Sequence, residues 1–273
     1  MNWKSTFIII VVCLIANLGL AQNVNTEEKN DTSKTGSSMN QIESKENVEN
    51  SNNGEISPIA NTENKSEYKS DYLLDNSETS KAVLYIQSKA NSESITDDEK
   101  SQIEEYFKQL KNAADNKDDY KAAYFIGSFY LSGIACEKDN AKGFYYTKKS
   151  ADLKYDYAQY PTGTCYQFGI GVEKDYQKAV EYFLRAAENE DISALYQLGL
   201  IYEYGQLGQA DYEKAVSYYQ EGADKGSLDC INRLASMYKL GIGVDCDYEM
   251  AVKYYKMAVD KNDSYSKVNL GNM

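Results

Sequence analysis

Three serine residues carry a lysine three positions later, which is the spacing found in serine hydrolases that interact with β-lactams. The pairs are Ser66–Lys69, Ser236–Lys239 and Ser264–Lys267, and a Lys-Thr-Gly triplet stands at residues 34–36. Lys34 and Ser66 lie in a polar segment that offers no preorganised oxyanion site. Serine and lysine are abundant in this chain, so such matches arise by chance. We therefore interpret the motif as coincidental and expect no catalytic residues.

The overall composition excludes several other kinds of site. The chain contains no histidine, which removes Ser-His-Asp and Cys-His nucleophiles and imidazole metal sites. Asp245-Cys246-Asp247-Tyr248-Glu249 alternates carboxylates like a calcium loop, but the glycine and the distal glutamate of such a loop are missing. A net charge of -13 argues against a nucleic-acid partner, whose binding needs lysine and arginine. We expect no metal and no cofactor.

The first 80 residues differ in composition from the rest. Residues 1–21 are typical of a secretory signal peptide, because Lys4 precedes an apolar run over 7–15 and residues 19–21 offer a small-x-small cleavage pattern. The alternative is a membrane anchor, but the apolar run is short for a bilayer span. No other segment is apolar enough to span a membrane. Residues 22–80 are polar and acidic, so they are predicted to be a disordered spacer.

From residue 122 the sequence repeats with a period of 36 residues. The units are 122–157, 158–193, 194–229 and 230–265, followed by a partial unit at 266–273. Four columns are identical in all four complete units: a tyrosine (Tyr130, Tyr166, Tyr202, Tyr238), a glycine (Gly133, Gly169, Gly205, Gly241), an aspartate (Asp139, Asp175, Asp211, Asp247) and a second tyrosine (Tyr146, Tyr182, Tyr218, Tyr254).

Each column has a structural reason. Residues such as Ala194, Leu198 and Tyr202 follow helical spacing and predict a first helix. The glycine supplies the left-handed turn that ends it, and the aspartate caps a second helix. The tyrosine rings are expected to fill the space between helix pairs, with their hydroxyls in water. Because one helical hairpin cannot bury its apolar face, the units are predicted to stack into an all-α solenoid, with residues 81–121 as a helical N-terminal cap.

These columns resemble the Sel-one-like repeat, a relative of the tetratricopeptide repeat. The match is best at residues 169–172, Gly-Ile-Gly-Val, and at residues 194–199, Ala-Leu-Tyr-Gln-Leu-Gly. The resemblance covers residues 122–271, and departures stand at Gly143, Pro161, Thr162 and Leu207. It implies a scaffold or adaptor of the kind found among secreted or periplasmic bacterial proteins and in the lumen of the endoplasmic reticulum.

The first helices of a stacked solenoid line its concave face. Aromatic and polar residues recur there, and aromatic residues and arginine are typical anchors of protein recognition. We therefore predict a protein or peptide partner on this face. The alternative, that the tyrosines only pack between repeats, stays open. The candidate binding residues are Tyr124, Tyr160, Phe168, Tyr196, Tyr204, Asn232 and Arg233, with Gln197 and Glu203 at neighbouring positions.

Removal of the signal peptide with its Cys13 would leave four cysteines, an even number that allows disulfides in an exported chain. Cys136 in the loop of unit one and Cys165 late in the first helix of unit two could be adjacent, so one bridge is predicted there. Cys230 and Cys246 stand at opposite ends of a helix and its loop, beyond the Cα spacing of roughly 4.4–6.8 Å that a bridge needs.

Residues 266–273 are expected to be half of a first helix, too short to be stable by itself. Without a covering second helix, Val252, Tyr255 and Val259 of unit four would form an exposed edge, which predicts end-to-end self-association.

The leading hypothesis is a non-enzymatic, exported interaction scaffold. Its location would be secreted or periplasmic, or the endoplasmic-reticulum lumen if the source is eukaryotic. The alternative is a periplasmic cell-wall or β-lactam-interacting hydrolase, a role that the resemblance links to cysteine-rich members of the family. The cysteine columns of those members are not filled in this chain.

Overall fold

The computed structural model describes residues 77–90, 92 and 94–273, so the predicted signal peptide and most of the predicted spacer lie outside the described residues. The described part is helical throughout, with no strand. Its helices are α2 (Glu78–Ala90), α3 (Asp97–Asn116), α4 (Tyr120–Ser132), α5 (Asn140–Asp152), α6 (Asp156–Phe168), α7 (Tyr176–Glu188), α8 (Ile192–Glu203), α9 (Tyr212–Asp224), α10 (Leu228–Leu240), α11 (Tyr248–Asp260) and α12 (Ser264–Gly271).

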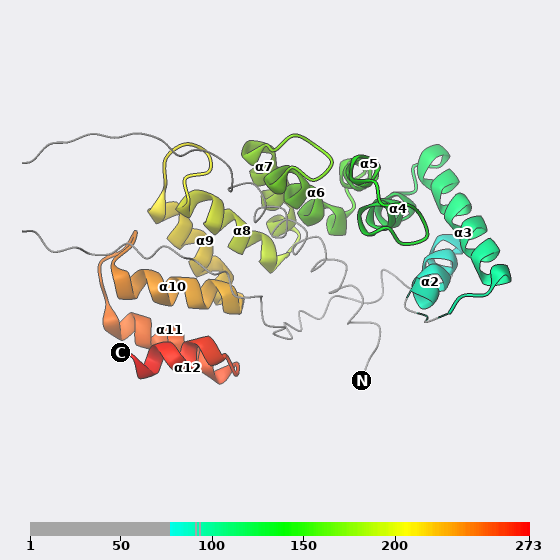
Figure 1. The fold of residues 1–273 in the computed structure, drawn as a ribbon. Helices are drawn as coiled ribbons and strands as arrows, with labels where there is room; N and C mark the ends of the chain where they lie inside the picture. Colours follow the sequence, from blue (N-terminus) through cyan, green and yellow to red (C-terminus); the bar gives the residue numbers. More distant parts are fainter. Residues whose placement is uncertain (1–76, 91, 93) are drawn as a thin grey trace, which may run out of the picture.

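The helices pack as consecutive pairs, and each pair packs on the next along the chain. The pairs follow an arc in which α4 and α6 lie on the inner side and α5 and α7 on the outer side (Figure 1). The predicted all-α solenoid is therefore confirmed. Among the described residues, no helix is both long enough and apolar enough to cross a bilayer.

The aspartate column starts the second helices as predicted. Each aspartate accepts a hydrogen bond from the backbone N–H three residues later, at 2.9 to 3.0 Å. Three glycines of the glycine column, Gly133, Gly169 and Gly241, end their first helices with positive φ. Unit three differs, because α8 ends at Glu203 and Leu207 replaces the second, left-handed glycine found at Gly171.

A second set of caps, which the sequence analysis missed, starts the first helices. The side chains of Asp119, Asp191, Ser227 and Asp263 accept backbone N–H bonds at 2.7 to 3.3 Å. In the same register, Tyr155 precedes α6 and provides no side-chain cap. These positions are also 36 residues apart in the sequence. Tyr155 and Ser227 stand where the others have aspartate, so the column is not identical in every unit.

The two tyrosine columns stack on each other within every unit, with ring centroids 5.6 to 5.9 Å apart. The expectation that their hydroxyls stand in water is wrong for three of the second tyrosines. Tyr146 donates to Asp115 at 2.8 Å, Tyr182 to Asp152 at 3.1 Å and Tyr254 to Gln220 at 2.8 Å. Each bond passes over the adjacent first helix and reaches the helix before it, which is α3, α5 or α9. These tyrosines therefore join unit one to the N-terminal cap, unit two to unit one and unit four to unit three.

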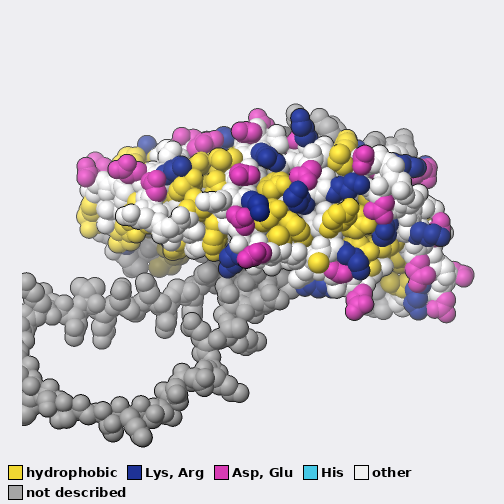
Figure 2. All heavy atoms as spheres, turned by 90° about the horizontal axis from the view of Figure 1, so that it is seen from above, with side chains coloured by type: hydrophobic (Ala, Val, Ile, Leu, Met, Phe, Trp, Pro, Cys, Tyr) yellow, Lys and Arg dark blue, Asp and Glu magenta, His cyan; other side chains and the backbone are white. Residues whose placement is uncertain are grey.

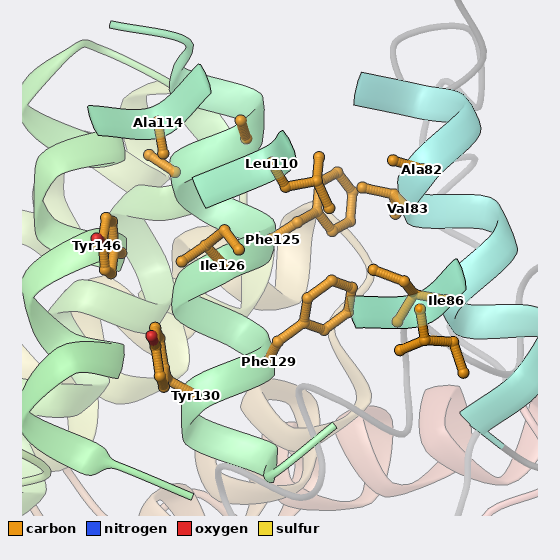
Figure 3. Close-up of a cluster of buried hydrophobic side chains, with 13 residues drawn as sticks. Ala82, Val83, Ile86, Leu110, Ala114, Phe125, Ile126, Phe129, Tyr130 and Tyr146 are labelled. Atoms are coloured by element: carbon orange, nitrogen blue, oxygen red, sulfur yellow. The ribbon is translucent and has the colours of Figure 1, made fainter. Parts of the chain in front are cut away.

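The N-terminal end is closed by α2 and α3. α2 begins within the last residues assigned to the spacer, and α3 begins at Asp97 with a capping box between Thr96 and Glu99. Ile86 of α2 lies beside Phe129 of α4, and Leu110 of α3 lies beside Phe125 of α4 (Figure 3). These two helices therefore bury the apolar side of the first repeat.

The C-terminal end corrects one expectation. Residues 264–271 form the helix α12, whose start is capped by Asp263 and which packs on α11. Tyr255, predicted to be exposed, is buried because α10 and α12 surround it, and its hydroxyl lies 3.0 Å from the Ser236 hydroxyl. Val252 and Val259, also predicted to be exposed, are half-buried. The exposed apolar residues of α12 are Tyr265 and Val268. End-to-end self-association stays a prediction, which light scattering on the purified chain would test.

Candidate functional site

The inner helices α4, α6, α8 and α10 carry the residues predicted to bind a partner (Figure 1). Tyr124, Tyr160 and Tyr196 are half-buried rather than fully exposed. Tyr160 packs on Phe183 at 5.5 Å between ring centroids, and Tyr196 packs on Tyr219 at 5.9 Å. Their rings therefore fill space between helices, and only part of each contributes to the surface.

The remaining predicted residues divide into two kinds. Asn232 directs both polar atoms of its amide to α12, donating to Asp263 at 3.2 Å and accepting from Ser266. Phe168 is half-buried at the end of α6. Tyr204, by contrast, is 60% exposed and lies beside Arg233, whose guanidinium is 5.7 Å from the ring centroid. The structure thus brings Tyr204 and Arg233 together on the inner face.

A buried carboxylate holds this pair in place. Glu203 is only 8% exposed and accepts bonds from Arg233 Nε at 2.8 Å, from Arg233 Nη2, and from the Tyr219 hydroxyl at 2.8 Å. Arg233 Nη2 also donates to the Tyr204 hydroxyl at 2.9 Å. Burial, followed by the Glu203 charge, raises the pKa of Tyr219 above its ordinary value. The tyrosine therefore stays protonated and keeps donating to Glu203.

The same two repeat positions form a second bridge one unit earlier. Gln167 and Gln197 precede Glu203 and Arg233 by 36 residues, and Gln167 Nε2 donates to Gln197 Oε1 at 3.1 Å. The Gln167 Oε1 atom is buried and has no donor among the described residues. Polar bridges between first helices are thus a repeated feature, neutral between units two and three and ionic between units three and four.

The cysteines of the described part are free thiols. Cys165 is buried beside Leu131, and burial raises its pKa to about 12. Cys136 is half-buried and packs against the N-terminal core cluster, where burial raises its pKa to about 11. Thiols with raised pKa values are poor nucleophiles. The Cys136–Cys165 bridge stays a prediction, which thiol counting on the native protein would test.

The serine–lysine motif at Ser236 and the calcium-like motif at Asp247 both have structural roles. The Ser236 hydroxyl donates to the Asn232 carbonyl at 3.1 Å within α10. Asp247 caps α11 by accepting from the Met250 N–H at 2.9 Å. No group of three or more metal-ligating side chains occurs among the described residues.

Four stacked helix pairs, whose first helices carry aromatic and polar residues on the inner face, define a helical-repeat solenoid. A model of the family described as "Sel1 repeat" matches residues 121–155, 156–191, 192–227 and 228–263, which make up more than half of the chain. The chain therefore belongs to the Sel1 repeat family, whose members are generally protein-interaction scaffolds. Comparison with curated proteins gives no match.

Two solved structures resemble the chain over most of its length. A Sel1 repeat protein from Oxalobacter formigenes shares 28% identity over 74% of this chain and 82% of its own, with a TM-score of 0.58. The antigen c5321 from uropathogenic Escherichia coli, which displays an SLR fold, shares 26% identity over 71% of this chain, with a TM-score of 0.59. The match covers only 41% of the length of that antigen.

Proposed function

We propose that this chain is an exported, non-enzymatic scaffold that binds a protein or peptide on its inner face. The observation that supports the proposal best is the exposed Tyr204 ring, oriented by Arg233, which is itself fixed by the buried Glu203. An aromatic side chain held in one orientation loses little entropy on binding, and Tyr and Arg are frequent hot-spot residues. Export is supported by the signal-like sequence of residues 1–21.

Tyr204→Ser tests the binding surface, with Tyr145→Ser as the matched control. The two tyrosines have nearly equal exposure, 60% and 58%, but Tyr145 lies on the second helix α5. In a pull-down from the native compartment, Tyr204→Ser is expected to lose the partner and Tyr145→Ser to retain it, with both melting temperatures near that of the unmodified chain. If the Tyr204→Ser variant retains the partner, binding on the inner face is contradicted.

N-terminal sequencing of the native protein tests export. The cleavage pattern predicts a mature terminus at Gln22. A chain that retains Met1 would contradict cleavage and favour the membrane-anchor alternative.

A further inference from the structure

The charges of residues 122–265 are distributed by position within the repeat. The junctions between units hold nine acidic and three basic residues, and the loops within units hold seven acidic and two basic ones. The remaining positions hold five acidic and ten basic residues. Both ends of the inner helices are therefore acidic edges, defined by the junctions 152–156, 188–191, 224–229 and 260–263 and by the loops 133–139, 169–175, 205–211 and 241–247.

The face viewed from above Figure 1 has a different pattern, because Lys, Arg, Asp and Glu side chains are interspersed there between hydrophobic patches (Figure 2). On the inner face, the Arg233 guanidinium is paired with Glu203. That pair carries no net charge, so the inner face would not repel a cation approaching between the two acidic edges.

One acidic column works against helix stability. The last residue of every second helix is acidic: Asp152, Glu188, Asp224 and Asp260. A carboxylate at this end faces the negative pole of the helix dipole, which is unfavourable. Glu188, Asp224 and Asp260 form no ion pair within the described residues. Asp224 accepts a bond from Gln220 Nε2 at 2.9 Å within α9, but no side-chain bond among the described residues explains the acidic Glu188 and Asp260.

An independent feature of the inner face also calls for a hydrogen-bond donor. Gln167 is 8% exposed, and its Oε1 atom lacks a donor while its Nε2 atom is bonded to Gln197. A buried acceptor without a donor is unfavourable. An amide N–H or an ammonium group from a bound segment would reach this atom only after the Gln167 side chain turns outward, because Oε1 is itself buried.

Apolar side chains recur along the same face. Phe168, Tyr204 and Leu240 stand 36 residues apart at the ends of three inner helices, and Tyr204 and Leu240 are 60% and 64% exposed. Packed helices lie roughly 10 Å apart, and an extended peptide in the polyproline II conformation advances about 9 Å in one turn of three residues. Every third residue of an extended segment could therefore contact a successive unit.

We propose that the inner face binds a basic, extended peptide segment. Its apolar side chains contact Tyr204 and Leu240, and its Lys or Arg side chains reach the acidic edges. The inference rests on the proposed function above and specifies the chemistry of its partner. Charge complementarity with the two acidic edges selects a basic segment over an acidic one.

Fluorescence anisotropy with the full purified chain tests the sign of the charge. The probe is a labelled synthetic peptide of about 12 residues that repeats Lys-Leu-Ser, and the matched control repeats Glu-Leu-Ser. The Lys peptide is expected to bind saturably, about tenfold more weakly at about 500 mM salt than at about 50 mM. The Glu peptide is expected not to bind. Equal binding of both peptides, or binding of neither, would overturn the inference.

Two triple variants distinguish an effect of the acidic edge from an effect of the net charge of the chain. The triple variant Glu188→Gln, Asp224→Asn, Asp260→Asn is expected to bind the Lys peptide about tenfold more weakly, with an unchanged or slightly raised melting temperature. The control triple variant Glu181→Gln, Glu213→Gln, Glu249→Gln makes the same change in net charge on the second helices and should bind within about twofold of the unmodified chain. Equal effects of the two triples would overturn the inference.

The native partner distinguishes this inference from the proposed function. If Tyr204→Ser loses the partner but the Glu188, Asp224 and Asp260 triple retains it, the scaffold function stands and the basic segment is wrong. If Tyr204→Ser retains the partner, the inner-face function itself fails.

Discussion

The contacts between units two and three and between units three and four use the same repeat positions with different chemistry. The first is a neutral bond between Gln167 and Gln197, and the second is a buried carboxylate, Glu203, that accepts two bonds from Arg233 and one from Tyr219. In both places the second helix of one unit packs on the first helix of the next, α7 on α8 and α9 on α10. The repeat geometry therefore does not depend on the bridge.

The first helix of unit two is also the weaker one in other respects. α6 contains Pro161 and starts without a side-chain cap at Tyr155. The buried side-chain atoms without a partner, within the described residues, are the Tyr155 hydroxyl, Gln159 Oε1 and Gln167 Oε1. In a solenoid, stability is the sum of local units and neighbour contacts. One backbone geometry can therefore hold units of unequal stability.

The largest loss of stability is expected when the bridges are cut. Arg233→Leu leaves Glu203 buried and uncompensated, which should lower the free energy of unfolding by about 3 kcal/mol. Gln197→Leu removes one neutral bond and should cost about 1 kcal/mol. Urea denaturation measures both. The double variant Glu203→Leu, Arg233→Leu should recover most of the larger loss, and equal losses for the two single variants would contradict the comparison.

Two hydroxyl deletions should have opposite signs. Tyr219→Phe loses a bond to the Glu203 carboxylate and should destabilise the chain by about 2 kcal/mol. Tyr155→Phe removes a buried hydroxyl that has no partner and should stabilise the chain by about 1 kcal/mol. Thermal melting followed by circular dichroism separates them. A loss of stability in Tyr155→Phe would show that this hydroxyl is satisfied in solution.

Gly163 and Gly199 are small residues that let the two helices of a unit approach closely. Replacing them by alanine should cause smaller losses of stability. A Cβ on Gly163 would lie 2.8 Å from ring carbons of Phe183, and one on Gly199 would overlap the Tyr219 ring more severely. Since Glu203 fixes Tyr219, Gly199→Ala should cost about 2 kcal/mol and Gly163→Ala less than about 1 kcal/mol. Ala235, buried at the same position in unit four, shows that a methyl group can be accommodated there. Equal losses would mean that the Tyr219 ring moves as freely as that of Phe183.

The smallest difference concerns pH. The backbone N–H of Lys178 holds the pKa of Asp175 below its ordinary value, so this contribution is full above about pH 4 and is lost as pH falls through the folded-state pKa. Burial raises the pKa of Asp191, so its contribution instead declines as pH rises above about 4. In melting curves across acidic pH, Asp175→Asn should flatten the rise of stability with pH, and Asp191→Asn should steepen it. The same change in both variants would contradict these assignments.

What could be predicted from the sequence were the features that depend on neighbours a few residues away. Asp175 caps α7 through a bond to Lys178, and Gly169 ends α6 by its own backbone angle, so the repeated columns were sufficient for both. The solenoid then followed because stacking is the way in which such hairpins bury their apolar faces.

The features that were missed depend on contacts about 30 residues away. The Glu203–Arg233 bridge and the bonds from Asn232 to α12 each join different units, and no local pattern specifies which side chains meet. A signal for the bridge did exist, because Glu203 and Arg233 are two of the three charged residues in the middle and late turns of the inner helices, the third being Lys239. That signal indicates a pair but not its depth of burial.

The stacked tyrosine pairs also give the solenoid an intrinsic spectroscopic signal. The only tryptophan of the chain is Trp3, inside the predicted signal peptide, so tyrosine would dominate the near-ultraviolet absorption and emission of a cleaved protein. Each unit contributes one stacked pair of nearly parallel rings, which makes every unit a similar chromophore. Near-ultraviolet circular dichroism would then respond to the loss of each unit, and replacing one pair by phenylalanine would remove the contribution of that pair while the other tyrosines of the unit remain.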